Sequence, residues 1–137
     1  MIILDTNVVS EIIADSEGTV AWNVASREIP VRITTVTLAE LRYGVELLPV
    51  GHRRQSLEER MNVWVEKLGA ETLLPLDAKA AESFGRIRAE RRILGRPIAF
   101  ADAAIAAICH RDQATLYTRN VNDFEHTGIA LYNPWLG

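Results

Sequence analysis

Short apolar runs alternate with helical stretches along the whole 137-residue chain. The first run, Ile2-Ile3-Leu4, is apolar at every position, which suits a strand buried on both faces. Further strands are expected at residues 31–35, 71–74, 114–118 and 129–132, and helices at residues 6–13, 19–27, 37–48, 54–68, 77–94 and 98–110. This alternation predicts one α/β domain over residues 1–137, with a central parallel sheet of about five short strands flanked by helices on both faces.

The composition excludes several classes of protein. Apolar residues make up 48% of the chain and charged residues 24%, which is ordinary for a globular domain. A single cysteine, Cys109, rules out a disulfide framework. The N-terminal apolar run meets Asp5 too early for a signal peptide, and no run approaches the roughly 20 residues that span a bilayer. We therefore expect a soluble, cytoplasmic protein with no membrane partner.

Polar residues follow two of the predicted strands. Asp5, Thr6 and Asn7 follow the first strand, and the fourth strand is followed by Thr118, Asn120 and Asp123. Ligands of open parallel sheets bind beyond the carboxyl ends of the strands. These residues are therefore expected at one edge of the sheet, and Glu40 joins them if its helix begins there.

Each acidic residue also has a purely structural explanation. Asp5 could cap the helix that follows it, Glu40 could close a capping box that begins at Thr37, and Asp123 could cap a turn. Asp102 is harder to explain, because it is the only charged residue between Arg96 and His110. An unpaired buried carboxylate costs several kcal/mol, and a position in the first helical turn recovers only about 0.3–1 kcal/mol. A half-solvated acid at that position is the alternative.

Taken together, the acidic residues predict a cation site. Converging carboxylates raise one another's pKa values and need a positive charge between them. The chain has only two lysines, Lys67 and Lys79, and neither is near the acids in sequence; Arg119 is an alternative counter-charge. Carboxylate oxygens with few nearby imidazoles or thiols favour Mg²⁺ or Mn²⁺ over Zn²⁺. Such sites are typical of phosphate ester chemistry.

Arginine accounts for 13 of the 15 basic residues. Its planar guanidinium binds phosphate in a bidentate manner and stacks on bases. Five arginines fall within eleven residues: Arg86, Arg88, Arg91, Arg92 and Arg96. They predict either a phosphate-binding rim or a solvated helix face that also carries Glu82 and Glu90.

Four ordered motifs resemble those of PIN-domain proteins: residues 1–7 (MIILDTN), 37–45 (TLAELRYGV), 101–106 (ADAAIA) and 118–124 (TRNVNDF). The ending at residues 133–135 (NPW) is similar to the VapC-like and FitB-like branch of that family. The resemblance covers essentially the whole chain, and it implies the PIN fold, a parallel sheet between two layers of helices.

The resemblance also implies a function, that of a Mg²⁺- or Mn²⁺-dependent endoribonuclease acting as the toxin of a type II toxin–antitoxin pair. Metal-activated water would hydrolyse RNA to leave 5′-phosphate and 3′-hydroxyl ends. By position, the catalytic and metal-binding acids are expected to be Asp5, Glu40, Asp102 and Asp123, with Asn120 as the alternative fourth residue. The supporting polar residues are expected to be Thr6, Asn7, Thr118 and Asn120, and the RNA-binding residues Arg86, Arg91, Arg92 and Arg119.

The expected partners are an RNA substrate, a second copy of the chain and a cognate antitoxin. The antitoxin would place an Arg or Lys among the carboxylates. Leu38, Leu41, Tyr43 and the helix from Arg54 could form the homodimer surface or belong to the core. 

The sequence leaves two other functions open and disfavours a third. One is a catalytically silent PIN fold that binds RNA or a partner, and another is a nuclease that acts on DNA. A phosphoacceptor receiver domain is disfavoured, because no lysine occurs after Lys79.

Overall fold

The computed structural model covers all 137 residues and contains a five-stranded, wholly parallel sheet in the order β3-β2-β1-β4-β5. The strands are β1 (Ile2–Leu4), β2 (Val31–Thr34), β3 (Leu73–Leu74), β4 (Thr115–Tyr117) and β5 (Ala130–Tyr132). The predicted α/β fold is confirmed. Both β3 and β4 are two residues shorter than expected, and β3 is shortened because residues 70–72 form a 3₁₀ turn instead of extending the strand.

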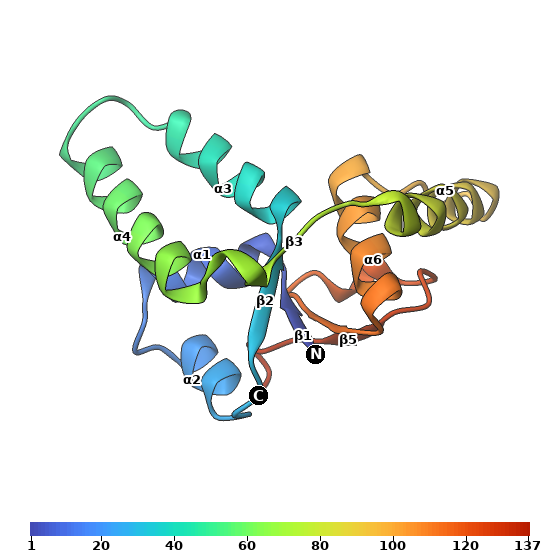
Figure 1. The fold of residues 1–137 in the computed structure, drawn as a ribbon, viewed down its shortest axis with the longest axis horizontal. Coiled ribbons are helices and arrows are strands. Elements are labelled where there is room, and N and C mark those ends of the chain that lie inside the picture. Colours follow the sequence, from blue (N-terminus) through green and yellow to red (C-terminus); the bar gives the residue numbers. More distant parts are fainter.

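Six α-helices cover the two faces of the sheet (Figure 1). Helices α1 (Thr6–Ala14), α2 (Thr19–Ala25), α3 (Thr35–Glu46) and α4 (His52–Leu68) lie on one side, and α5 (Ala78–Ile93) and α6 (Phe100–Asp112) on the other. Short 3₁₀ helices lie at η1 (Ala70–Thr72) and η2 (Val121–Phe124). No helix has both the length and the apolar character required to cross a membrane.

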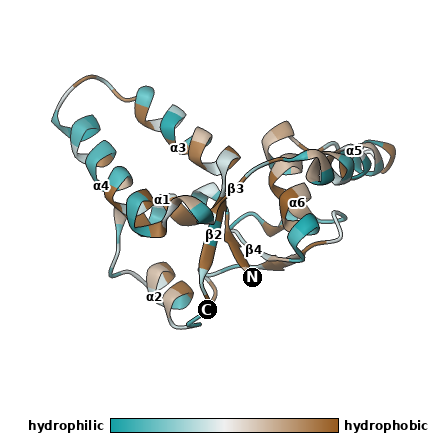
Figure 2. Ribbon diagram, viewed as in Figure 1, coloured by the Kyte–Doolittle hydropathy of each residue, from teal (hydrophilic) through white to brown (hydrophobic).

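Alternate residues of β1 face two separate cores. Ile2 and Leu4 pack with residues of α1, α2, α3 and α4, while Ile3 packs with α5 and α6. All of these residues are almost fully buried, and the strands are correspondingly hydrophobic in Figure 2. Helix α6 is buried along its whole middle, Ala103 to Cys109, as its apolar character on all sides predicted.

The order of the strands determines where ligands can approach. The chain runs from β1 outward to β2 and β3, then returns to the other side of β1 to form β4. The loops after β1 and β4 therefore lead away from each other, which opens a crevice at the carboxyl ends of these two strands. The backbone N–H of Asp5 donates to Tyr117 O at 2.9 Å, so the two loops begin side by side.

Helix α3 begins two residues earlier than expected. Its N-cap is Thr34, whose hydroxyl accepts the backbone N–H of Thr37 at 3.0 Å. The expected capping box from Thr37 to Glu40 is therefore wrong. Both residues lie inside the helix, three positions apart on one face, and their side chains are free to point toward α1.

Arg91 is not part of an exposed rim, which corrects its assignment as an RNA-binding residue. Its side chain is buried (4% exposed) and donates to the backbone carbonyls of Arg96, Asp123 and Glu125 at 2.7–3.0 Å. The guanidinium thus ties α5 to η2. Arg92, the next residue, is exposed.

The residues considered for a dimer surface differ in exposure. Leu41 is a member of the core, and Leu38 is partly buried against it. Tyr43, in contrast, is 67% exposed.

Replacing Arg91 should test the tie between α5 and η2. Arg91→Ala removes a buried side chain and leaves three part-buried backbone carbonyls without this donor, and we expect it to lower the free energy of unfolding by about 3 kcal/mol. Arg92→Ala removes the same charge from an exposed position and should change it by less than about 0.5 kcal/mol. Urea unfolding of both variants measures the difference. Equal effects would show that the tie contributes nothing to stability.

Candidate active site

Asp5 lies at the centre of the crevice, directly after β1. Its Oδ1 accepts the backbone N–H of Thr6 at 2.8 Å, and its Oδ2 accepts the Thr118 hydroxyl at 2.8 Å and the Asn7 amide at 3.2 Å. The side chain therefore caps α1 and also belongs to the site. Burial raises the pKa of Asp5, and the hydrogen bonds offset only part of this rise.

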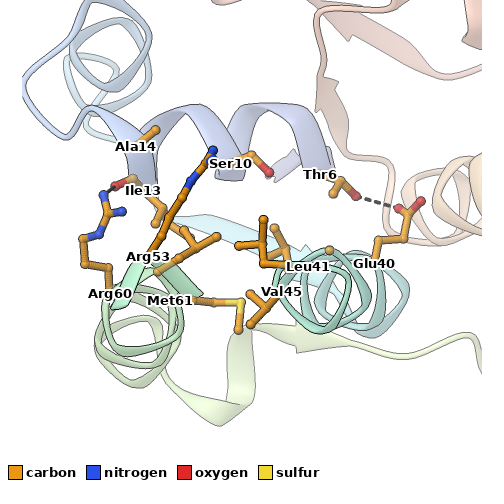
Figure 3. Close-up of a pocket in the computed structure, with 13 residues that line it drawn as sticks. Thr6, Ser10, Ile13, Ala14, Glu40, Leu41, Val45, Arg53, Arg60 and Met61 are labelled. Atoms are coloured by element: carbon orange, nitrogen blue, oxygen red, sulfur yellow. Dashed lines mark hydrogen bonds between the residues drawn. The ribbon is translucent and has the colours of Figure 1, made fainter. Parts of the chain in front are cut away.

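Glu40 reaches the same site from α3. Its Oε1 accepts the Thr6 hydroxyl at 2.6 Å, as the dashed line in Figure 3 shows, and the Thr37 hydroxyl lies 3.3 Å from that of Thr6. The negative charge of Glu40 helps to raise the pKa of Asp5, so the two carboxylates are electrostatically coupled. Thr37 was expected only as a cap. Because the helix starts before Thr37, Thr37 and Glu40 both lie inside it, and their spacing of three residues places them on the same face of the helix.

Asp102 lies half-buried in the first turn of α6. Its pKa is raised to about 6, first by burial and then by the negative charges of Asp5, Asp123 and Glu40; the positive charge of Arg91 opposes the rise. All four predicted acids therefore act on one electrostatic site, although they are far apart in sequence.

The fourth acidic position is on η2. Asp123 is exposed, and its charge contributes to the raised pKa of Asp102. The backbone N–H of Asn120 donates to the Thr118 hydroxyl at 3.1 Å, so Asn120 supports the site through its main chain. This arrangement favours Asp123 over Asn120 as the fourth acid.

A polar network holds the two loops together around Asp5. Asn7 donates its side-chain amide to Asp5 and accepts the backbone N–H of Arg119 at 3.1 Å. Thr118 accepts from Asn120 and donates to Asp5. The structure thus places all four predicted supporting residues in contact with the acids or with one another.

No positive side chain forms an ion pair with any of the four acids. None of them takes part in any of the ion pairs of the structure. The guanidinium of Arg119, the alternative counter-charge, lies instead over the ring of Trp135, 5.2 Å from its centroid. The site therefore holds concentrated negative charge.

The donor set fits a hard cation that keeps part of its water shell. No three or more His, Cys, Asp or Glu side chains lie close enough together in the structure to hold a metal ion by themselves. Mg²⁺ is usually held by one or two carboxylates and retains several waters, so an open set of carboxylates is compatible with it. A closed tetrahedral zinc site is not compatible with this arrangement.

A groove of about 390 Å³ begins at Glu40 and runs between α1, α3 and α4. Thr6 and Glu40 lie at one end, and Arg53 and Arg60 at the other (Figure 3). Its floor is apolar and includes Ile13, Leu41, Val45, Leu57 and Met61. We refer to it as the α1/α3/α4 groove.

The remaining predicted RNA-binding arginines are exposed, and they lie on two sides of the site. Arg86 and Arg92 are on α5, where Arg86 pairs with Glu90 at 3.6 Å. Arg119 follows β4.

Carboxylates gathered at the carboxyl edge of a parallel sheet with this strand order define a PIN-type α/β domain. The PIN domain profile matches residues 2–129, and the chain belongs to the PIN-domain family.

Known members of the family resemble the chain over its whole length. Toxin FitB of Neisseria gonorrhoeae is 37% identical over 137 residues, covering 98% of this chain and 99% of the relative. The VapC ribonuclease Y4jK of Sinorhizobium fredii is 34% identical, with 98% of both chains covered. The tRNA(fMet)-specific endonuclease VapC of Shigella flexneri is 30% identical, with 96% of both covered.

Solved structures agree with the fold. The crystal structure of FitAcB from Neisseria gonorrhoeae matches with a TM-score of 0.87 at 35% identity, covering 98% of this chain and 99% of that chain. The VapBC2 structure from Rickettsia felis, bound to a DNA fragment from its promoter, gives a TM-score of 0.81 at 25% identity over 97% and 98% of the two chains.

The raised pKa of Asp102 predicts how stability depends on pH in the absence of metal. Because its pKa is about 6 in the folded state and 3.8 for an ordinary aspartate, the folded state binds this proton more tightly. Stability should therefore fall as the pH rises from about 4 to about 6, and then level off. Asp102→Asn should be more stable than the parent at pH 8, by an amount that shrinks toward pH 4.

Asp77→Asn is the matched control, measured by urea unfolding in EDTA. Asp77 caps α5, and the amide of Ala80 and then the Arg111 side chain hold its pKa below the usual value. Asp77→Asn should therefore lower the free energy of unfolding at pH 8, whereas Asp102→Asn should raise it. A loss of stability at pH 8 in Asp102→Asn as well would contradict charge repulsion at the site.

Proposed function

We propose that the chain is a metal-dependent endoribonuclease and the toxin of a type II toxin–antitoxin pair. The observation that carries this proposal is the un-neutralised site of Asp5, Glu40, Asp102 and Asp123. Relatives that cover almost the whole chain are named as toxins and ribonucleases, which supports the same assignment.

Mg²⁺, for which Mn²⁺ can substitute, fits this site. Asp5 and Asp102 would be the principal ligands, with Glu40 and Asp123 completing the set. When bound, the ion supplies a lowered pKa for a coordinated water and neutralises charge on the phosphate oxygens. 

The protein's own contribution is orientation. Thr118, Asn7 and the Thr6 amide hold both oxygens of Asp5, which keeps this carboxylate in one position before substrate arrives. Thr6 links Glu40 to the same network. Preorganised groups of this kind need not rearrange during the reaction, which lowers its barrier.

The proposed reaction is hydrolysis of an RNA phosphodiester. Water attacks phosphorus in line, the bond from phosphorus to the 3′ oxygen breaks, and the products carry 5′-phosphate and 3′-hydroxyl ends. No histidine base is needed for this chemistry.

The proposed protein partner is a cognate antitoxin that occupies the α1/α3/α4 groove. The apolar floor suits a hydrophobic helix face, and the groove leads directly to Glu40. An Arg or Lys of the partner placed there would supply the positive charge that the acids lack. We also propose that the toxin is a homodimer.

A cleavage assay tests the nuclease. The purified chain, free of partner, should cut total RNA with Mg²⁺ and stop when EDTA is added. Asp5→Asn and Asp102→Asn should keep the fold and lose at least about 100-fold in rate. Thr118→Val, which removes only the hydroxyl that orients Asp5, should lose about 10- to 100-fold. RNA binding without any cleavage in Mg²⁺ would instead identify a catalytically silent PIN module.

Gly44 offers a way to block the groove without harming the fold. It lies in α3, lines the groove, and has no heavy atom within 4 Å of the position that a Cβ would take. Gly44→Leu should therefore fill the groove and weaken inhibition by the antitoxin at least about 10-fold, while RNA cleavage stays unchanged.

Gly44→Ala is the control, since it adds only a methyl group. It should raise the free energy of unfolding by about 0.5–1 kcal/mol and leave inhibition nearly unchanged. Titrating each variant with the cognate antitoxin measures inhibition, and urea unfolding measures the change in stability. Full inhibition of Gly44→Leu would move the antitoxin to another surface.

A further inference from the structure

A second hollow, of about 800 Å³, lies outside the acidic site on the α5 side of the sheet. It is formed by one face of α5, including Phe84 and Arg88, and by Pro97 and Ile98 of the segment that leads into α6. Phe100, the first residue of α6, packs against Phe84 with ring centroids 5.0 Å apart. Its side chain nevertheless remains 58% exposed.

Arg88 completes an aromatic and cationic surface. Its guanidinium lies 5.8 Å from the centroid of Phe84 and 5.7 Å from that of Phe100. Arg92, one turn further along α5, lines the same hollow and is exposed. Neither arginine takes part in any ion pair of the structure. We call Phe84, Arg88, Arg92 and Phe100 the aromatic–arginine platform.

The platform lies next to the acids. Phe100 precedes Asp102 by two residues in the first turn of α6, and successive helical residues are about 100° apart, so the two side chains leave the helix on nearly opposite sides. On α5, Arg91 lies between Arg88 and Arg92 in sequence and is close enough to Asp102 for its charge to act there. The start of α6 thus separates the platform from the acids by the width of one helix.

Charge on this part of the chain suits an anionic polymer. Residues 78–98 contain six basic and only two acidic residues, although the whole chain has a net charge of −3. Positive charge next to exposed aromatic rings is the combination by which proteins hold single-stranded nucleic acid, with arginine on the phosphates and rings under the bases. An apolar interface with another protein would not require Arg88 and Arg92 to remain outside ion pairs, so the platform suits nucleic acid better than a protein partner.

We infer that the platform binds an unpaired base of the RNA strand on one side of the scissile phosphate. The base stacks on Phe100 beside the Arg88 guanidinium, and Arg92 contacts an adjacent phosphate. Bases in a duplex are already stacked and paired, so the subsite selects single-stranded RNA. This inference rests on the proposed ribonuclease function, since it concerns the same substrate.

The test measures binding of fluorescein-labelled 12-nucleotide RNA in EDTA, where cleavage does not interfere. Phe100→Ala should weaken binding of single-stranded RNA about 10-fold, and Phe100→Trp should not, because indole also stacks. A series of the same RNA, each lacking the base at one position, locates the stacked nucleotide. For one member of the series, parent and Phe100→Ala should bind with equal affinity, because the base that stacks on Phe100 is missing. Arg92→Gln should lower the slope of log affinity against log salt by about 0.7.

Three outcomes would overturn the inference. The first is equal binding by parent and Phe100→Ala, and the second is parent binding to duplex as tight as to single strands. The third is a dimer, measured by sedimentation, that dissociates in Phe100→Ala while RNA affinity is unchanged, which would make the platform an interface between copies. Because these measurements are made without metal, they remain informative even if the chain fails to cleave RNA.

Discussion

Repulsion among four carboxylates is the constraint on which the rest of the molecule depends. A chain that only needed to fold would separate these acids or pair them with lysine or arginine. Here β1 ends at Asp5 in the middle of the sheet, and Thr118, Asn7 and the Thr6 amide hold its carboxylate in place. Burial and neighbouring charge raise the pKa of Asp102 to about 6. The stability lost at this site must be recovered by the two apolar cores on either side of the sheet, which is the usual relation between a functional site and its scaffold.

Much of this arrangement could be predicted from the sequence, because it follows from rules about local pattern. Apolar runs determine the strands, and acids directly after parallel strands must meet at one edge. Two features could not be predicted. Residues 34, 35 and 37 are all threonine, so any of them could cap α3, and only packing decides that Thr34 does so and Thr37 faces the site. Helix α5 carries arginines on every face, and only contact with η2, about 32 residues further along the chain, shows that Arg91 is buried.

The two surfaces that flank the acids differ in chemistry, and the difference suggests separate uses. The α1/α3/α4 groove has an apolar floor and suits a helix of a protein partner. The aromatic–arginine platform is cationic and suits a nucleic acid. They lie on opposite sides of the sheet and meet only at the carboxylates. An inhibitor in the groove would therefore compete with RNA at the acids themselves, without covering the whole surface that RNA uses.

The buried Arg91 side chain connects α5 to η2, so it determines where η2 lies as well as stabilising the fold. Arg91 belongs to the helix that also carries Arg88 and Arg92. Its guanidinium donates hydrogen bonds to the main chain of the segment that carries Asp123. These hydrogen bonds fix the position of η2 relative to α5. The segment that carries Asp123 is therefore positioned by the same helix that presents Arg88 and Arg92, so the outermost carboxylate and the neighbouring cationic surface share one anchor.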